Sequence, residues 1–103
     1  MNIGLIGTNY HLSPLKDIEY IYLNDLQRLA LLEAAKRHEN ISEMVLLFTC
    51  NRVEIYFIGD DLSKAFQWVK GWLSVEKKIS GEMVTSIVRE TRGDDVINHL
   101  CKV

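Results

Sequence analysis

Alternating apolar and small residues at the start of the chain predict a β-strand over residues 2–8. One predicted face carries Ile3, Leu5 and Gly7, and the other carries Gly4 and Ile6. Glycines inside a strand indicate that another part of the backbone approaches closely. The chain therefore starts, in this interpretation, with a strand that packs tightly near its end.

Two more strands are predicted over residues 43–49 and 53–58. A short link, Cys50-Asn51-Arg52, joins them. In the second strand the apolar residues Val53, Ile55 and Phe57 alternate with Glu54 and Tyr56. This alternation is typical of a β-strand.

Helical spacing of apolar residues predicts two longer helices. Asn24 is the expected N-cap of the first, whose apolar stripe comprises Leu26, Leu29, Ala30 and Ala34. The second follows a turn at residues 59–61, and its stripe comprises Leu62, Ala65, Phe66, Val69 and Leu73. Pro14 can open a short helix at its first turn, whereas residues 15–23 mix helical and strand signals.

A fourth strand is expected over residues 83–90, and a further helix is expected to begin at residue 94 and to be cut short at residue 103. The resulting order, β-α-β-β-α-β and then α, is the ferredoxin-like split β-α-β order. The predicted fold class is therefore α+β: an antiparallel four-stranded sheet with two helices on one face, plus a truncated C-terminal helix.

Composition limits the class of protein. A chain of 103 residues with 48% hydrophobic and 25% charged residues fits one globular domain and excludes a disordered chain. The net charge of -2 gives no broad basic surface, so a nucleic acid would have to be contacted locally. No apolar run reaches the length of a membrane span, and the N-terminus has no secretory pattern.

The two cysteines, Cys50 and Cys101, are too few for a disulfide scaffold and share no metal-ligand spacing with the histidines. We therefore expect no metal site, and two reduced thiols in the cytoplasm.

The residue cluster that suggests chemistry is Thr49-Cys50-Asn51-Arg52, at the junction of two strands. A thiol at a strand terminus is partly presented to solvent, and a nearby guanidinium favours the thiolate. Arg52 could equally bind a substrate carboxylate through two hydrogen bonds. From residue types alone, an isolated cysteine is more often a small buried hydrophobic residue than a nucleophile.

A family resemblance changes this balance. Residues 49–56, Thr-Cys-Asn-Arg-Val-Glu-Ile-Tyr, resemble the signature of glutamyl-tRNA reductase. Near the N-terminus, Gly7-Thr8-Asn9, then Pro14-Leu15 and Glu19, are similar to the Gly-x-Asn-His-x-x-Ala-Pro stretch of that family and its following acidic residue. Residues 96–103 resemble the helix that carries the histidine of the family. The three blocks occur in the family's order and cover nearly the whole chain.

The resemblance implies a cysteine-dependent acyl transfer. Cys50 would attack glutamate esterified to tRNA and form a thioester, which NADPH reduces to glutamate-1-semialdehyde in the full-length enzyme. Thr49, Asn51 and Arg52 would line the glutamate pocket, with Arg52 bound to the free carboxylate of the substrate. His99 would act near the reacting centre in proton transfer. This reaction opens the five-carbon route to tetrapyrroles.

The resemblance also implies partners and missing parts. The family forms homodimers, acts in the cytoplasm and passes its product to an aminomutase, which is a candidate partner. We expect residues 1–103 to be the single N-terminal catalytic domain, because the chain has no Gly-x-Gly-x-x-Gly segment and ends before the NADPH-binding and dimerisation domains of the family. Alone, it is expected not to complete hydride transfer.

Two positions depart from the family pattern. Tyr10 stands where the family usually has His, although His11 is adjacent, and Ile18 stands where it usually has Arg. The second difference suggests one basic group fewer near the pocket. The alternative function is a ferredoxin-like module that binds a ligand or partner without chemistry, with Cys50 as a structural residue.

Overall fold

The computed structural model describes residues 2–102, and position 103 of the last predicted helix lies outside them. This part of the chain forms five helices and four strands. They are β1 (Asn2–Asn9), α1 (Leu15–Ile21), α2 (Asp25–Lys36), β2 (Glu43–Thr49), β3 (Arg52–Gly59), α3 (Leu62–Lys77), α4 (Gly81–Ile87), β4 (Arg89–Arg92) and α5 (Asp94–Lys102).

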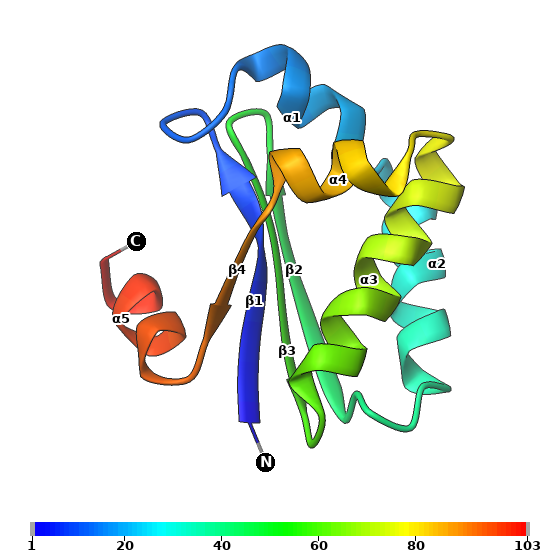
Figure 1. The fold of residues 1–103 in the computed structure, drawn as a ribbon, viewed down its shortest axis with the longest axis vertical. Coiled ribbons are helices and arrows are strands. Elements are labelled where there is room, and N and C mark those ends of the chain that lie inside the picture. The colour runs from blue at the N-terminus through cyan, green and yellow to red at the C-terminus, as the bar shows by residue number, and fades with distance from the viewer. Residues whose placement is uncertain (1, 103) are drawn as a thin grey trace.

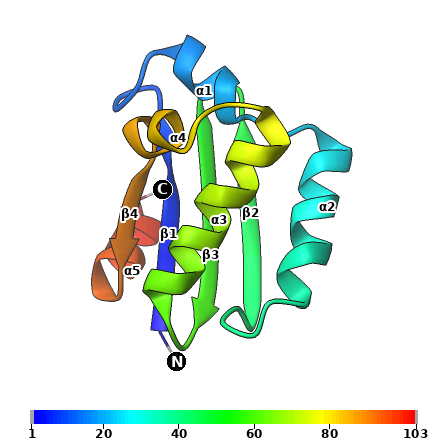
Figure 2. The same ribbon diagram turned by 45° about the vertical axis from the view of Figure 1, so that its right-hand side comes forward.

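The strands form one sheet in the order β2-β3-β1-β4, and every neighbouring pair is antiparallel. This is the predicted ferredoxin-like arrangement, which is confirmed. The long helices α2 and α3 cover one face of the sheet, and α1 and α4 close one end of the same layer (Figures 1 and 2). Helix α5 lies on the opposite side of the sheet (Figure 1).

The main core lies between the sheet and α3. Phe57 of β3 and Phe66 of α3 meet edge to face with ring centroids 5.1 Å apart. Gly4 makes room for them, because a Cβ atom there would lie 2.9 Å from the Phe57 ring. The apolar stripe predicted for this helix is buried throughout.

The N-terminal end of α2 is formed as expected. The Asn24 side chain accepts a hydrogen bond from the Gln27 amide at 2.8 Å, and the Gln27 side chain accepts one from the Asn24 amide at 2.9 Å. This reciprocal capping box satisfies two amides at the helix start.

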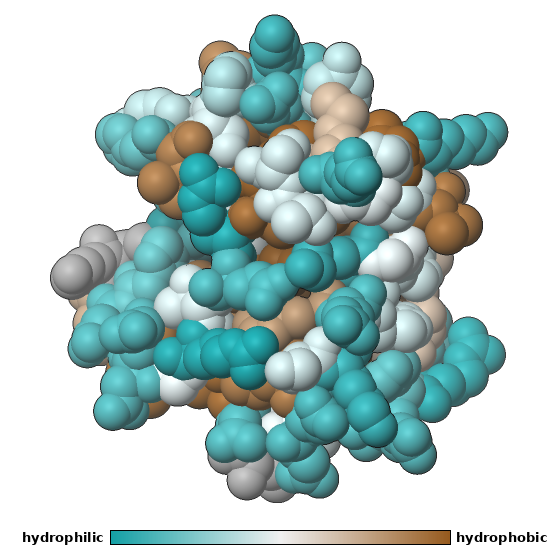
Figure 3. Space-filling model, in the orientation of Figure 1, coloured by the Kyte–Doolittle hydropathy of each residue, from teal (hydrophilic) through white to brown (hydrophobic). Residues whose placement is uncertain are grey.

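The predicted buried stripe of α2 is wrong. Leu26 and Leu29 are 79% and 56% exposed, whereas Leu31 and Ala35 are buried. Both pairs of residues fit helical spacing. Packing of α2 against the sheet decides that Leu31 and Ala35 are the buried pair. Apolar residues therefore reach the surface among polar ones, as Figure 3 shows for the face seen in Figure 1.

The strand predicted over residues 83–90 is also wrong for most of its length. Residues 81–87 form α4, and the fourth strand is limited to Arg89–Arg92. The Ser80 side chain caps the helix by accepting a hydrogen bond from the Met83 amide at 3.1 Å. Val84 and Ile87, three residues apart, then pack into the core, which outweighs their β-branched preference for a strand.

Candidate active site

The β2–β3 turn presents the predicted nucleophile to solvent. Thr49, Cys50 and Asn51 are all exposed, and Cys50 is a free thiol. The Asn51 amide donates to the Thr49 hydroxyl at 3.3 Å, and the Asn51 carbonyl accepts from the Tyr10 amide at 2.9 Å. The turn is therefore fixed to the loop that follows β1.

Directly after this turn, β3 places Arg52, Glu54 and Tyr56 two residues apart, so all three share the face that α5 covers. Glu54 is only 2% exposed. Its Oε1 atom forms an ion pair with Arg52 Nε at 3.1 Å and accepts a hydrogen bond from the Tyr56 hydroxyl at 2.9 Å. Burying a carboxylate costs free energy unless the group is paired. Glu54 is paired with both Arg52 and Tyr56.

Helix α5 supplies the remaining side chain of the site, His99. Gly93 adopts a left-handed conformation with φ of 62°, and its amide donates to the Ile3 carbonyl at 2.9 Å, which turns the chain back over the sheet. Val96 is fully buried against Leu5 and Tyr56. His99 lies nearly one turn further along the same side of the helix.

The His99 ring reaches the buried carboxylate. His99 Nε2 lies 2.5 Å from Glu54 Oε2, and the histidine side chain is 31% exposed. Both carboxylate oxygens of Glu54 are thus bonded, one of them to α5. Burial, then the hydrogen bond to Glu54 and the charge of that carboxylate, raise the pKa of Tyr56, so its hydroxyl keeps the proton that it donates.

A cavity of about 460 Å³ lies between the loop after β1, the β2–β3 turn and α5. The residues that line it are Asn9, Tyr10, His11, Thr49, Asn51, Arg52 and His99. Four of the predicted site residues, Thr49, Asn51, Arg52 and His99, are therefore brought together, and Cys50 lies in the turn between two of them. Ile18 is not part of this site, because it is 1% exposed in the main core. The expectation that its replacement of an arginine removes a basic group near the pocket is therefore wrong for this fold.

Glu54 is a site residue that the sequence pattern did not predict. The pattern placed it only among the polar positions of β3. A recoverable signal was an acidic residue two positions after Arg52 in an otherwise apolar strand, which puts both charges on one face. What covers that face cannot be read from the strand.

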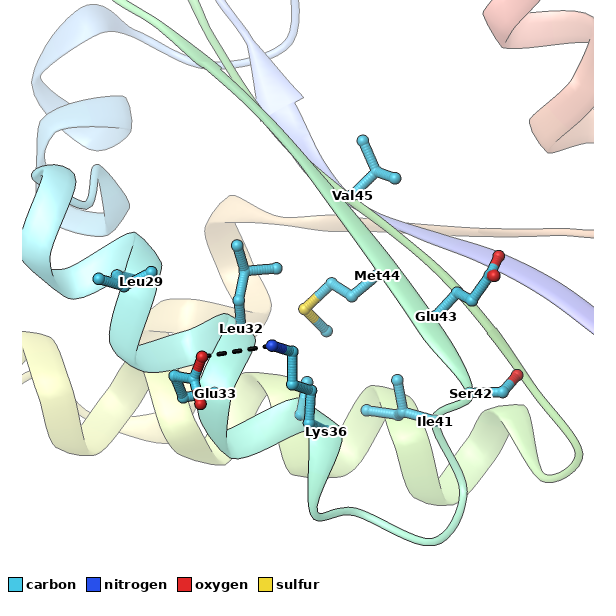
Figure 4. Close-up of a pocket in the computed structure, with 10 residues that line it drawn as sticks. Leu29, Leu32, Glu33, Lys36, Ile41, Ser42, Glu43, Met44 and Val45 are labelled. Carbon is cyan, nitrogen blue, oxygen red and sulfur yellow. Dashed lines mark hydrogen bonds and ion pairs between the residues drawn. The ribbon is translucent and has the colours of Figure 1, made fainter.

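Another cavity, of about 550 Å³, separates α2 from β2 and has no comparable chemistry (Figure 4). Leu29 and Leu32 of α2 lie on one side, and Met44 points toward them from β2. Its charged pair, Lys36 and Glu33 at 3.3 Å, lies along α2 itself. The cavity beside Cys50 is therefore the better candidate for a reaction.

Comparison with known proteins decides the family. The sequence profile described as "Glutamyl-tRNAGlu reductase, N-terminal domain" matches residues 6–103. The chain belongs to this family. The glutamyl-tRNA reductase of Oceanobacillus iheyensis is 33% identical over 104 residues and that of Streptococcus sanguinis is 28% identical over 103 residues. All of this chain is covered in both cases, but only 22% and 25% of those proteins.

The fold of this reductase-family domain has a solved counterpart. The structure of glutamyl-tRNA reductase from Methanopyrus kandleri matches 95% of this chain with a TM-score of 0.65 and 20% sequence identity, over 21% of that protein. This likeness supports the fold. The chain thus spans about a quarter of the length of the relatives that it matches.

Two further observations bear on possible ligands and surroundings. Within residues 2–102, no group of three or more His, Cys, Asp and Glu side chains could hold a metal ion. No helix in the described part of the chain has both the length and the apolar character needed to cross a membrane.

Proposed function

We propose that this chain is the acyl-capturing domain of a glutamyl-tRNA reductase and that Cys50 is its nucleophile. The observation that carries the proposal is the exposed Cys50 thiol in a turn whose neighbours, together with Arg52 and His99, line one cavity. Membership of the family supports the substrate class, glutamate esterified to tRNA.

The step is a transfer of an acyl group from oxygen to sulfur. Sγ of the Cys50 thiolate attacks the ester carbonyl carbon, a C–S bond forms, and the C–O bond to the tRNA ribose breaks. The proton lost by the thiol ends on the ribose oxygen that leaves. No electrons are gained or lost, so the products are a glutamyl thioester on Cys50 and free tRNA. His99, at the wall of the same cavity, is the proposed group for moving the proton.

Arg52 is the proposed recognition group for the side-chain carboxylate of the substrate. Its Nε atom forms an ion pair with Glu54. Among the described residues, no hydrogen bond involves its two Nη atoms. The Nη1–Nη2 edge can therefore hold a carboxylate through two parallel bonds. Thr49 and Asn51 line the cavity as further polar contacts for the glutamyl group.

Reduction of the thioester to glutamate-1-semialdehyde requires a hydride, which we assign to NADPH in the full-length enzyme. The chain has no Gly-x-Gly-x-x-Gly segment, so its residues do not fit a dinucleotide cradle, and none is assigned to the cofactor. As part of the same proposal, residues 1–103 act as one catalytic domain of a cytoplasmic, homodimeric enzyme. That enzyme would open the five-carbon tetrapyrrole route and pass its product to an aminomutase.

Intact-protein mass spectrometry tests the capture step. The chain is incubated with glutamyl-tRNA and is expected to gain the mass of one glutamyl group, which hydroxylamine removes as expected for a thioester. Cys50→Ala should abolish the gain. Cys101→Ala is the matched control, because this second exposed thiol lies on α5 and should be dispensable.

Two results would contradict the proposal. One is equal labelling of both cysteines, which would indicate non-specific acylation. The other is binding of glutamyl-tRNA without acylation of Cys50, which would favour the non-catalytic binding module.

A further inference from the structure

Glu54 is the residue that joins the two sides of the candidate site. Through Oε1 it bonds Arg52 on its own strand, and through Oε2 it bonds His99 on α5, 45 positions away in the sequence. Within the described residues, both proposed working groups of the cavity wall are thus fixed by one carboxylate. Glu54 itself does not line that cavity.

Stability alone gives a weak reason for a carboxylate at this position. Removing an ion pair from water costs free energy that its attraction often fails to recover, and well-packed apolar residues can replace such pairs without loss. The neighbouring contacts on this face, between Leu5, Tyr56 and Val96, are apolar or mostly so. An apolar residue at position 54 could extend that cluster. The carboxylate at position 54 is therefore better explained by its effect on Arg52 and His99.

The chemistry of the contacts defines that effect. A carboxylate paired with arginine is ionised and only accepts hydrogen bonds. The proton shared with His99 therefore belongs to Nε2, which leaves Nδ1 as the ring atom that can exchange a proton elsewhere. On the other side, the bond to Arg52 Nε leaves the Nη1–Nη2 edge for a ligand.

We propose that Glu54 is a positioning residue that orients His99 for proton transfer and Arg52 for carboxylate binding at the same time. This inference rests on the proposed function. It implies that α5 must pack against the sheet for acyl capture, because Glu54 reaches His99 only when α5 lies there. The side chain of Glu54 acts through its two partners and does not touch the substrate.

The first test uses the unaltered chain. A short hydrogen bond from Nε2 to a carboxylate gives a downfield, slowly exchanging imidazole N–H signal in proton NMR. We expect such a signal, lost in His99→Gln and retained in the control His38→Gln, whose ring nitrogen Nδ1 accepts from the Asn40 amide at 3.2 Å. Absence of the signal from the folded wild-type chain would overturn the inference without any variant at Glu54.

The second test uses Glu54→Gln, which keeps the shape and removes the charge. We expect capture of the glutamyl group to slow by about tenfold or more, because a well-placed proton acceptor contributes about 100-fold and a misaligned one loses part of that. Preference for glutamyl-tRNA over the same tRNA charged with glutamine should fall as well. Alkylation of Cys50 by iodoacetamide should not change, because the turn is held by other contacts.

Glu43→Gln is the matched control, since Glu43 is exposed at the far end of β2, and it should behave like the wild-type chain. A folded Glu54→Gln chain with the wild-type rate and preference would overturn the role of Glu54. A wild-type chain that captures no glutamyl group contradicts the proposed function instead, so the two failures can be told apart.

Discussion

Gly7 lies directly opposite Glu54 where β1 pairs with β3. A Cβ atom at Gly7 would overlap the Val53 carbonyl oxygen and lie 2.9 Å from the Glu54 Cα atom. These are backbone atoms, which cannot move aside as a flexible side chain does. The absence of a side chain at Gly7 therefore lets β1 approach the strand that carries Arg52 and Glu54, and the site depends on this approach.

Gly7→Ala is expected to lower the free energy of unfolding by about 2 kcal/mol or more, because the added methyl group forces the two strands apart. Gly71→Ala is the matched control. Gly71 is exposed in α3 and an added Cβ atom would contact nothing within 4 Å, so alanine should stabilise the helix by about 1 kcal/mol. Urea unfolding of the two variants measures both effects. Equal effects of the two substitutions would contradict the close approach at Gly7.

Arg52→Lys should weaken discrimination between substrates more than capture itself. Lysine keeps the positive charge but not the planar edge that holds a carboxylate through two bonds. We expect the preference for glutamyl-tRNA over the same tRNA charged with glutamine to fall by about tenfold to 100-fold, in proportion to one lost charge-assisted hydrogen bond. Competition between the two charged tRNAs, read by mass spectrometry of Cys50, measures this ratio. Arg89→Lys, at an exposed position of β4, is the control and should leave the ratio unchanged.

Tyr56 should make the protein less stable at alkaline pH. Its pKa in the folded state is raised by burial and by Glu54, relative to an unfolded value of about 10. A raised pKa means that the stabilising contribution is complete below about pH 10 and is lost as the pH rises toward the folded value, since only the unfolded chain releases the proton readily.

Urea unfolding from neutral pH to above pH 10 tests this expectation. Tyr56→Phe should be less stable at neutral pH by about 1 kcal/mol, because Glu54 loses a hydrogen bond, and should show a smaller alkaline decline. Tyr20→Phe, at an exposed position of α1, is the control for the tyrosine ring and should follow the wild-type curve. An identical alkaline decline in Tyr56→Phe and the wild-type chain would show that Tyr56 is not the cause.

The two departures from the family pattern should differ in their effect on stability when they are reversed. Ile18→Arg places a charge in the main core and is expected to cost at least about 3 kcal/mol of stability. Tyr10→His should change stability by no more than about 0.5 kcal/mol, because Tyr10 is 54% exposed and its bond to the turn is made by the backbone amide. Thermal unfolding compares them. A stable Ile18→Arg chain would mean that α1 can turn this residue outward.

The local pattern of apolar and polar residues was enough to predict most of the fold. The alternation in β1 and β3, the Asn24 cap and the apolar stripe of α3 each involve residues within one element, where the period of the backbone decides which side chains share a face. The same reasoning failed for α2, whose two apolar stripes are equally periodic, and for residues 81–87, where β-branched residues lie in a helix.

The sequence by itself determined the order of β1, α2, β2, β3 and α3, the short turn that carries Cys50, and the placement of Arg52 directly after it, because all three depend on neighbours along the chain. Only the tertiary structure decided that Glu54 is buried and that His99 meets it. Those contacts join residues 45 positions apart, and they depend on α5 folding back over the sheet at Gly93. Strand periodicity shows that Glu54 and Arg52 share a face, whereas packing alone decides what covers that face.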